Sequence, residues 1–283
     1  MPTVNPGQAK ELRGKIDYAS ILGVLLAMAS LVGGFLLEGG RLAEVAQLTA
    51  VLIVFGGTLG AVLLNTPIDL LLRTVRRLPE VFFHSPEQFG EITDQIARLA
   101  LKSRREGLIS LEDDLGKLED PFLRRAVALA VDGAGLQEYR AELEVDIEME
   151  ERRANAEAHV LESAGGYSPT FGILGAVLGL MQVMKVIGNI DEVGRGIAVA
   201  FVATVYGVGA ANLLFLPAAG KLRARSQSRI HAHEMIIEGV AGILEGMNPN
   251  MIRRKLSSFQ HSGAAAIPAR PIPQPVRVNS SQG

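Results

Sequence analysis

Four stretches of the chain are apolar over the roughly 20 residues that a helix needs to cross the hydrocarbon core of a bilayer. Only the third contains a charged residue, Lys185, which is close enough to its far end for the ammonium group to reach the interface. The stretches cover residues 18–37, 45–64, 167–190 and 196–219. This pattern predicts an all-α integral membrane protein with four transmembrane helices.

The hundred residues between the second and third stretches are polar and predict a large helical domain. Asp120 followed by Pro121 is typical of a helix start, with Asp as the N-cap and Pro at the first helical position. Residues 137–161 are acidic, rich in Ala and free of Gly and Pro, so they predict a long helix that leads directly into the third stretch.

The basic residues orient these stretches, because cytoplasmic loops of membrane proteins carry an excess of Lys and Arg. The N-terminal arm has three, residues 66–165 have 13, and the tail after Ala219 has nine. The two short connections, 38–44 and 191–195, have one arginine each. We therefore expect both termini and the long middle segment to be cytoplasmic, and the two short turns to face outward.

The expected organisation has six parts. They are a cytoplasmic N-terminal arm (1–17), transmembrane helices one and two (18–65), a cytoplasmic helical domain (66–166), transmembrane helices three and four (167–219), C-terminal cytoplasmic helices (220–260) and a disordered tail rich in Pro, Ser and Ala (261–283).

Composition and motifs argue against an enzyme, a metal site and a nucleic-acid partner. The 28 basic and 30 acidic residues nearly balance, and the absence of cysteine excludes disulfides and thiol chemistry. The G-x-G at Gly194–Gly196 is expected in an outward turn and follows no strand. His231 and His233 are two residues apart, which places them on different helix faces.

The apolar stretches contain no Asp, Glu or His deep inside them, although ion pathways usually retain such costly groups. If the protein helps to conduct ions, the titrating carboxylate must therefore come from another polypeptide.

Small residues recur at helical spacing in the third and fourth stretches. The third has Gly172, Gly175, Ala176 and Gly179, and the fourth has Gly196, Ala200 and Thr204 on one stripe and Ala203, Gly207 and Ala211 on another. Such stripes let helix backbones approach closely in lipid. Two interpretations are open: packing within the chain, or a surface that holds a partner's transmembrane helix, with Thr204 placed to hydrogen-bond an ion, water or carboxylate.

Two prolines are expected at the cytoplasmic ends of these helices. Pro169 is expected in the first turn of its helix, where the missing N–H is tolerated. Pro217 lies inside the fourth stretch, where it frees a carbonyl and favours a kink. As a pair they are candidates for a conformational hinge.

The sequence resembles the MotA/PomA family, the larger stator subunit of the bacterial flagellar motor, and most closely its MotC-type members. The resemblance covers roughly residues 17–260 and is carried by GGYSPTFGILGAVLGLMQVM, GIAVAFVATVYGVGAANLLFLP, FGGTLGAVL, PFLRRAVALAVDG and EGMNPNMIRRKL. It implies a four-helix protein of the bacterial inner membrane, with five copies around two copies of a MotB-type partner. The partner's single transmembrane Asp would bind the ion.

The resemblance also implies roles for individual residues. Pro169 and Pro217 match the family's two functional prolines, and Thr204 matches its pore-facing threonine. Arg104 and Glu112, eight residues apart, match the charged pair that contacts the rotor protein FliG, and Arg105 and Arg124 are charged neighbours that could share that role.

The coupling ion is expected to be the proton, and no cofactor is expected. Sodium needs several oxygen ligands. Sodium-driven family members place hydroxyl residues where this chain has Ala176 and Ala203. The alternatives left open are a sodium-driven stator of the same family, an energiser of the ExbB/TolQ kind, which has three spans, and a membrane scaffold without ion coupling.

Overall fold

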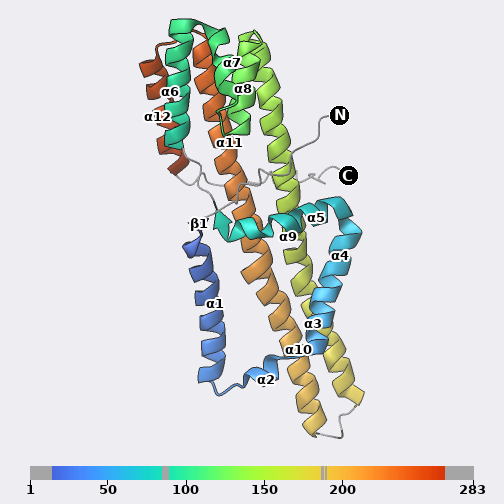
Figure 1. The fold of residues 1–283 in the computed structure, drawn as a ribbon. Coiled ribbons are helices and arrows are strands. Elements are labelled where there is room, and N and C mark those ends of the chain that lie inside the picture. The colour runs from blue at the N-terminus through green and yellow to red at the C-terminus, as the bar shows by residue number, and fades with distance from the viewer. Residues whose placement is uncertain (1–14, 85–88, 186–187, 189, 265–283) are drawn as a thin grey trace, which may run out of the picture. The chain divides into compact units, whose positions relative to one another are not determined.

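A computed structural model describes residues 15–84, 89–185, 188 and 190–264, and these residues are almost entirely helical (Figure 1). The elements in chain order are β1 (Lys15–Ile16), α1 (Tyr18–Leu37), α2 (Leu42–Val45), α3 (Leu48–Val51), η1 (Leu52–Gly56), α4 (Gly57–Asn65), α5 (Ile68–Arg77), η2 (Leu78–Val81), β2 (Phe83–His84), α6 (Phe89–Glu106), η3 (Leu108–Leu111), α7 (Glu112–Leu115), α8 (Pro121–Val131), α9 (Leu136–Lys185), α10 (Ile190–Ala210), η4 (Ala211–Phe215), α11 (Leu216–Leu244) and α12 (Pro249–Ala264). The two strands form one short antiparallel pair.

Among the residues that the structure describes, four helical segments are long and apolar enough to cross a membrane, in agreement with the number expected. They are Tyr18–Leu37, Leu48–Asn65, Leu136–Lys185 and Glu192–Leu244. The second begins at Leu48 because α2 ends at Val45 and the backbone leaves the helical conformation at Ala46 and Gln47.

Several expected boundaries differ from the structure. Residues 191–195, expected as a turn, are helical, because α10 begins at Ile190; the G-x-G at Gly194–Gly196 therefore lies inside a helix. Near the C-terminus, α12 continues to Ala264, so the first four residues of the expected tail (261–264) are helical. The prolines of the tail, which would interrupt a helix, come only after these residues. The remaining tail and most of the expected N-terminal arm lie outside the described residues.

The described residues form two compact units. The first contains those up to residue 84 together with 142–230, and the second contains 89–141 together with 231–264.

The first unit is organised by two long helices, α9 and the continuous run of α10, η4 and α11 (Figure 1). The helix predicted over 137–161 does lead directly into the third apolar stretch, since α9 runs without a break for 50 residues, or about 75 Å. Two segments are π-helical, η1 in the second candidate span and η4 directly before Pro217.

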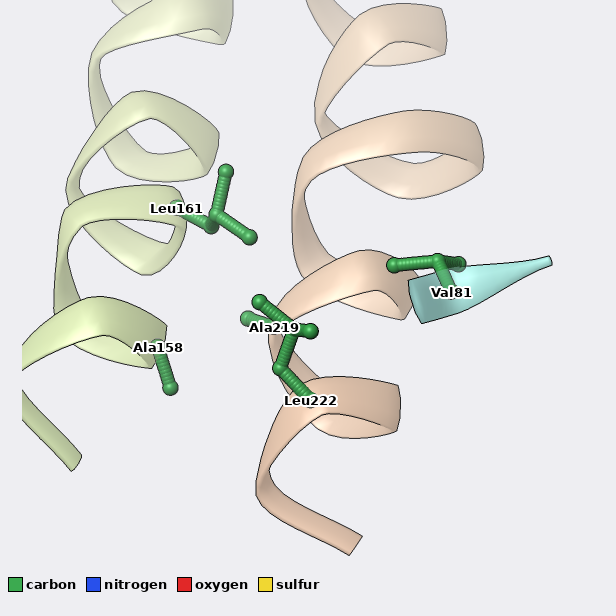
Figure 2. Packing of buried hydrophobic residues seen from close by; sticks show 5 residues of the cluster. All are labelled: Val81, Ala158, Leu161, Ala219 and Leu222. Atoms are coloured by element: carbon green, nitrogen blue, oxygen red, sulfur yellow. The ribbon is translucent and has the colours of Figure 1, made fainter. Parts of the chain in front are cut away.

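Where α9 meets α11, an apolar cluster lies beside the end of η2. Figure 2 shows Ala158 and Leu161 of α9 on one side of Ala219 and Leu222 of α11, with Val81 on the other side. Ala158 and Ala219 are almost completely buried, and their small side chains allow the two helices to pack closely. This cluster fixes α11 against α9 immediately after Pro217.

The start of α1 is held by a partly buried ion cluster. Asp17 is the N-cap, accepting a hydrogen bond from the Ser20 N–H at 3.2 Å. Its carboxylate also lies 2.7 Å from Lys221 Nζ and 3.0 Å from Arg225 Nη2, and the hydrogen bond from Lys221 holds the pKa of Asp17 well below its usual range. The guanidinium of Arg225 also donates to the Val81 carbonyl. The N-terminus of α1 is therefore attached to α11, whereas the helix itself has no buried residue.

The second unit packs α6 and α12 around a core that includes Ile96, Leu123, Met235, Ile252 and Leu256. The predicted helix start at Asp120 is confirmed: its carboxylate accepts a hydrogen bond from the Leu123 N–H at 2.8 Å, and Pro121 is the first residue of α8.

Candidate functional site

The backbones of α9 and α10 approach closely at a pair of glycines. A Cβ added to Gly172 would lie 2.9 Å from the carbonyl oxygen of Ala203, and one added to Gly207 would lie 2.6 Å from the carbonyl oxygen of Ser168. The Ser168 hydroxyl donates a hydrogen bond to the Gly207 carbonyl at 3.0 Å. Glycine is required at both positions because the neighbouring atoms belong to backbone.

The contact continues along both helices. A Cβ at Gly175 would lie 2.8 Å from the Ala203 methyl, and one at Gly179 would lie 3.1 Å from the Ala200 methyl. The glycines of the third stretch therefore face the fourth stretch of the same chain. Of the two interpretations left open by the sequence, packing within the chain describes Gly172 and Gly175 in this structure.

Pro169 does not lie in the first turn of a helix, as expected from the sequence; it lies inside α9, 33 residues after Leu136. Its ring removes the N–H that would bond to the carbonyl of Gly165, one turn earlier. Two glycines, Gly165 and Gly166, precede it by one turn. The proline alone favours a helix start, whereas the pattern without Gly or Pro over residues 137–161 favours one continuous helix. The structure follows the second pattern.

The turns that contain the two prolines are in contact. A Cβ added to Gly165 would lie 2.8 Å from Cδ2 of Leu216, the residue directly before Pro217. The Leu216 side chain thus occupies the space above Gly165, one turn before Pro169. This contact joins the two candidate hinge positions, and the sequence spacing alone did not indicate it.

Pro217 follows the π-helical turn η4, which ends two residues before it. Pro217 is exposed and lines a cavity of about 600 Å³ together with Gly23 and Ala27 of α1 and Phe82. The α11 helix therefore has an open, apolar space on the side of this proline.

Thr204, Ala176 and Ala203 lie near the α9–α10 contact with different exposures. Thr204 is half-buried, and its hydroxyl donates a long hydrogen bond of 3.4 Å to the Ala200 carbonyl. Ala176 is half-buried, whereas Ala203 is buried in a cluster with Ala50, Val54 and Val202. Tyr206, next to this cluster, donates to the Val45 carbonyl at 2.6 Å.

The charged residues assigned to the rotor interface lie in the second unit, around the turn between α6 and α7. Arg104 and Arg105 are exposed in the last turn of α6, and Glu112 is exposed at the start of α7. Gly107 turns the chain between them with φ of +88°, a conformation that other residues rarely adopt. Arg124 lies on α8, where its guanidinium donates to the Leu118 carbonyl and so anchors the loop before that helix.

A second charged group holds this turn and was not found from the sequence. Lys102 Nζ lies 2.7 Å from Asp114 Oδ2, and Lys117 Nζ lies 2.6 Å from Asp114 Oδ1. The hydrogen bond from Lys102, with that from Lys117, lowers the pKa of Asp114. The Lys102–Asp114 pair joins α6 to α7 and thereby fixes the exposed Arg104 and Glu112 relative to each other.

Within the part of the chain that the structure describes, no group of three or more His, Asp or Glu side chains is arranged to hold a metal ion. His233 stacks on Phe122 with ring centroids 3.9 Å apart, and His231 lies at the edge of Phe89.

Two family descriptions match the chain in succession. The "Motility protein A N-terminal" family matches residues 21–107, and the "MotA/TolQ/ExbB proton channel family" matches residues 115–235.

Individual relatives match over most of their length. The Motility protein A of Bacillus subtilis (strain 168) is 35% identical to this chain. The match covers 86% of this chain and 91% of the length of that protein. Two solved structures are similar. The structure of C. jejuni MotAB matches with a TM-score of 0.83 and 33% identity, over 86% of this chain and 96% of that chain. The flagellar MotAB stator complex from Bacillus subtilis matches with a TM-score of 0.80 and 33% identity, over 89% of this chain and 96% of that chain.

Proposed function

Because the chain belongs to the MotA family of flagellar motor stator subunits, we propose that it generates torque from proton flow, together with a MotB-type partner. Relatives described as MotAB complexes support such a partner and an oligomeric assembly, for which we propose five copies of this chain. The partner would supply the carboxylate that takes up each proton.

The chain is a multi-pass membrane protein of the inner-membrane stator family. We propose that the four spans include residues 18–37, 48–65, 167–185 and 196–219, with both termini and the segment after the second span in the cytoplasm. The distribution of Lys and Arg supports this orientation.

The proton is the proposed ion because the α9–α10 contact offers few oxygen ligands. Ala203 is buried against Gly175, and Ala176 adds no hydroxyl group. Thr204 is the hydroxyl nearest in sequence to Ala203, and its bond to the Ala200 carbonyl is long enough to exchange for another acceptor. A sodium ion would need several more oxygens than this.

The observation that carries the mechanism is the contact between the turns of Pro169 and Pro217. A change of charge on the partner's carboxylate would favour one packing of α9 against α10 over another. The Gly165–Leu216 contact would pass that change to α11, and the cavity beside Pro217 leaves room for movement. Arg104 and Glu112, with Arg105 and Arg124 as neighbours, would then act on charges of a FliG-type rotor protein.

The hinge is tested by replacing Pro169 with Ala in a host strain that lacks its own stators and carries this chain with its partner. We expect the complex to assemble in the membrane and swimming to be lost. Ala supplies an N–H that can bond to the Gly165 carbonyl, and this added hydrogen bond would stiffen the helix at the proposed hinge. Pro249→Ala, at the first position of α12, is the control and should leave swimming intact. Normal swimming of P169A would contradict the proposal.

A further inference from the structure

Helix α5 presents an apolar stripe beside a cationic one. Ile68, Leu72 and Val75 are 54%, 48% and 52% exposed and follow one another at steps of four and three residues, which places them on one face. Arg73 and Arg76 are exposed on the adjoining face. Neither arginine forms an ion pair with another residue that the structure describes.

The rotation of α5 about its axis is fixed by its opposite face. Leu70 and Leu71 pack on a cluster that contains Val62, Val160 and Ala164. Thr74 is fully buried, and its hydroxyl donates to the Leu70 carbonyl at 2.9 Å. At the C-terminal end Arg77 is held by Glu157 at 2.6 Å. The exposed stripes are therefore set by the fold.

The position of α5 along the first unit is also fixed. The second candidate span ends at Asn65 and α5 begins at Ile68, so three residue steps, at most about 10 Å, separate them. Figure 1 shows α5 running across α9 at the end of α4. Phe82 and Phe83, which follow it, are also partly exposed, at 38% and 53%.

An apolar stripe beside arginines matches the boundary between acyl chains and phosphates. Guanidinium groups bind phosphate oxygens with paired hydrogen bonds. Asp69 is the one carboxylate among residues 68–77, and the Arg73 Nε–H is directed at the Asp69 main-chain carbonyl, 3.2 Å away. The helix thus carries a net positive charge next to the end of a membrane span.

We infer that α5 is a membrane-surface anchor that binds the headgroups of acidic phospholipids through Arg73 and Arg76, with Ile68, Leu72 and Val75 inserted among the acyl chains. The inference rests on the membrane orientation proposed above, and it requires neither ion flow nor torque. The anchor would hold the end of the second span and the start of α9's transmembrane part at a fixed depth.

The test uses the full chain purified with its partner and reconstituted in nanodiscs of equal phosphatidylglycerol and phosphatidylcholine. Spin-labelled versions of each lipid report how strongly the protein enriches phosphatidylglycerol at its surface. We expect R73Q/R76Q to reduce that enrichment several-fold and to remove most of its salt dependence. R73K/R76K should keep most of the enrichment, because it preserves the charge.

The matched control is R152Q/R153Q, which makes the same change of charge on exposed positions of α9, about 20 Å along the helix before Tyr167. It should leave the enrichment unchanged. Equal enrichment by R73Q/R76Q and the unmodified protein would overturn the inference. A smaller oligomer of R73Q/R76Q with unchanged phosphatidylglycerol enrichment would also overturn the inference. The exposed face of α5 would then be a contact between copies of the chain. Because motility is not measured, this result is independent of the torque mechanism.

Discussion

Single glycines decide how closely α9 and α10 pack. At Gly207 an added methyl group would lie 2.6 Å from the Ser168 carbonyl, whereas at Gly209, two residues later on the same helix, it would meet nothing within 4 Å. Alanine substitutions at these two positions therefore distinguish two effects on stability: the close backbone contact, present only at Gly207, and the low helix propensity of glycine, present at both.

We expect Gly207→Ala to destabilise the complex by about 1–3 kcal/mol, because neither backbone can move away from the added methyl group without disturbing the Ser168 hydrogen bond. Gly209→Ala should be neutral or stabilise it by up to about 1 kcal/mol, since alanine is the better helix former. Thermal unfolding of the purified complex measures both. Equal stabilities of the two variants would show that the helices are not in close contact here.

Asp114 gives the second unit a dependence on pH. Lys102 lowers the carboxyl pKa from its ordinary value of 3.8 in the folded state. The ion pair therefore stabilises the turn at pH values above about 3.8, and this stabilisation is lost as the pH falls through the lowered value. Near neutral pH it is fully present.

We expect Asp114→Asn to increase amide exchange across residues 107–117 several-fold at neutral pH, as acidification does in the unmodified protein. Asp113→Asn, at an exposed neighbouring position, is the control and should leave exchange unchanged. Rates are compared after correction for intrinsic exchange at each pH. Unaltered exchange in D114N would mean that the Lys102–Asp114 pair does not hold α6 to α7.

At the scale of helices, the contact between Gly165 and Leu216 joins the two proline-containing turns. We expect Gly165→Ala to leave folding nearly intact, because the atoms displaced belong to the end of a flexible side chain. The variant should nevertheless slow flagellar rotation, since Leu216 can no longer occupy the same place beside α9. Rotation of tethered cells measures this.

Gly166→Ala is the matched control, because a methyl group there would meet nothing within 4 Å. It should rotate at the normal speed. A G165A motor as fast as G166A would show that the two turns do not move together.

Helix continuity was predictable from the sequence because it depends on local pattern. The absence of Gly and Pro over residues 137–161 correctly predicted that α9 enters the third stretch without a break, and Asp120–Pro121 correctly predicted the start of α8. The prediction that Pro169 lies in a first helical turn is wrong, because the helix that begins at Leu136 continues through the proline.

Contacts between distant residues could not be predicted in the same way. Ser168 and Gly207 are 39 residues apart, and nothing in their spacing specifies which face of α10 meets α9. The small-residue stripes indicated close helix packing but not whether the neighbour belongs to the same chain. Arg104 and Glu112 are singled out by the family resemblance, and their role stays a prediction, whereas the Lys102–Asp114 pair that fixes their turn depends on the path of η3.

At the scale of the whole molecule, the apolar stretches contain no carboxylate, so the proposed mechanism takes the proton site from the partner and links it through the long helices to Arg104 and Glu112. The proposed coupling ion distinguishes this subunit from that of a sodium-driven motor built on the same fold.

The most direct test is the rotation speed of tethered cells that lack their own stators and carry this chain with its partner. We predict that speed is unchanged when external sodium is removed and that rotation stops when a protonophore collapses the proton gradient. Rotation that stops on removal of sodium while the proton gradient is intact would contradict proton coupling.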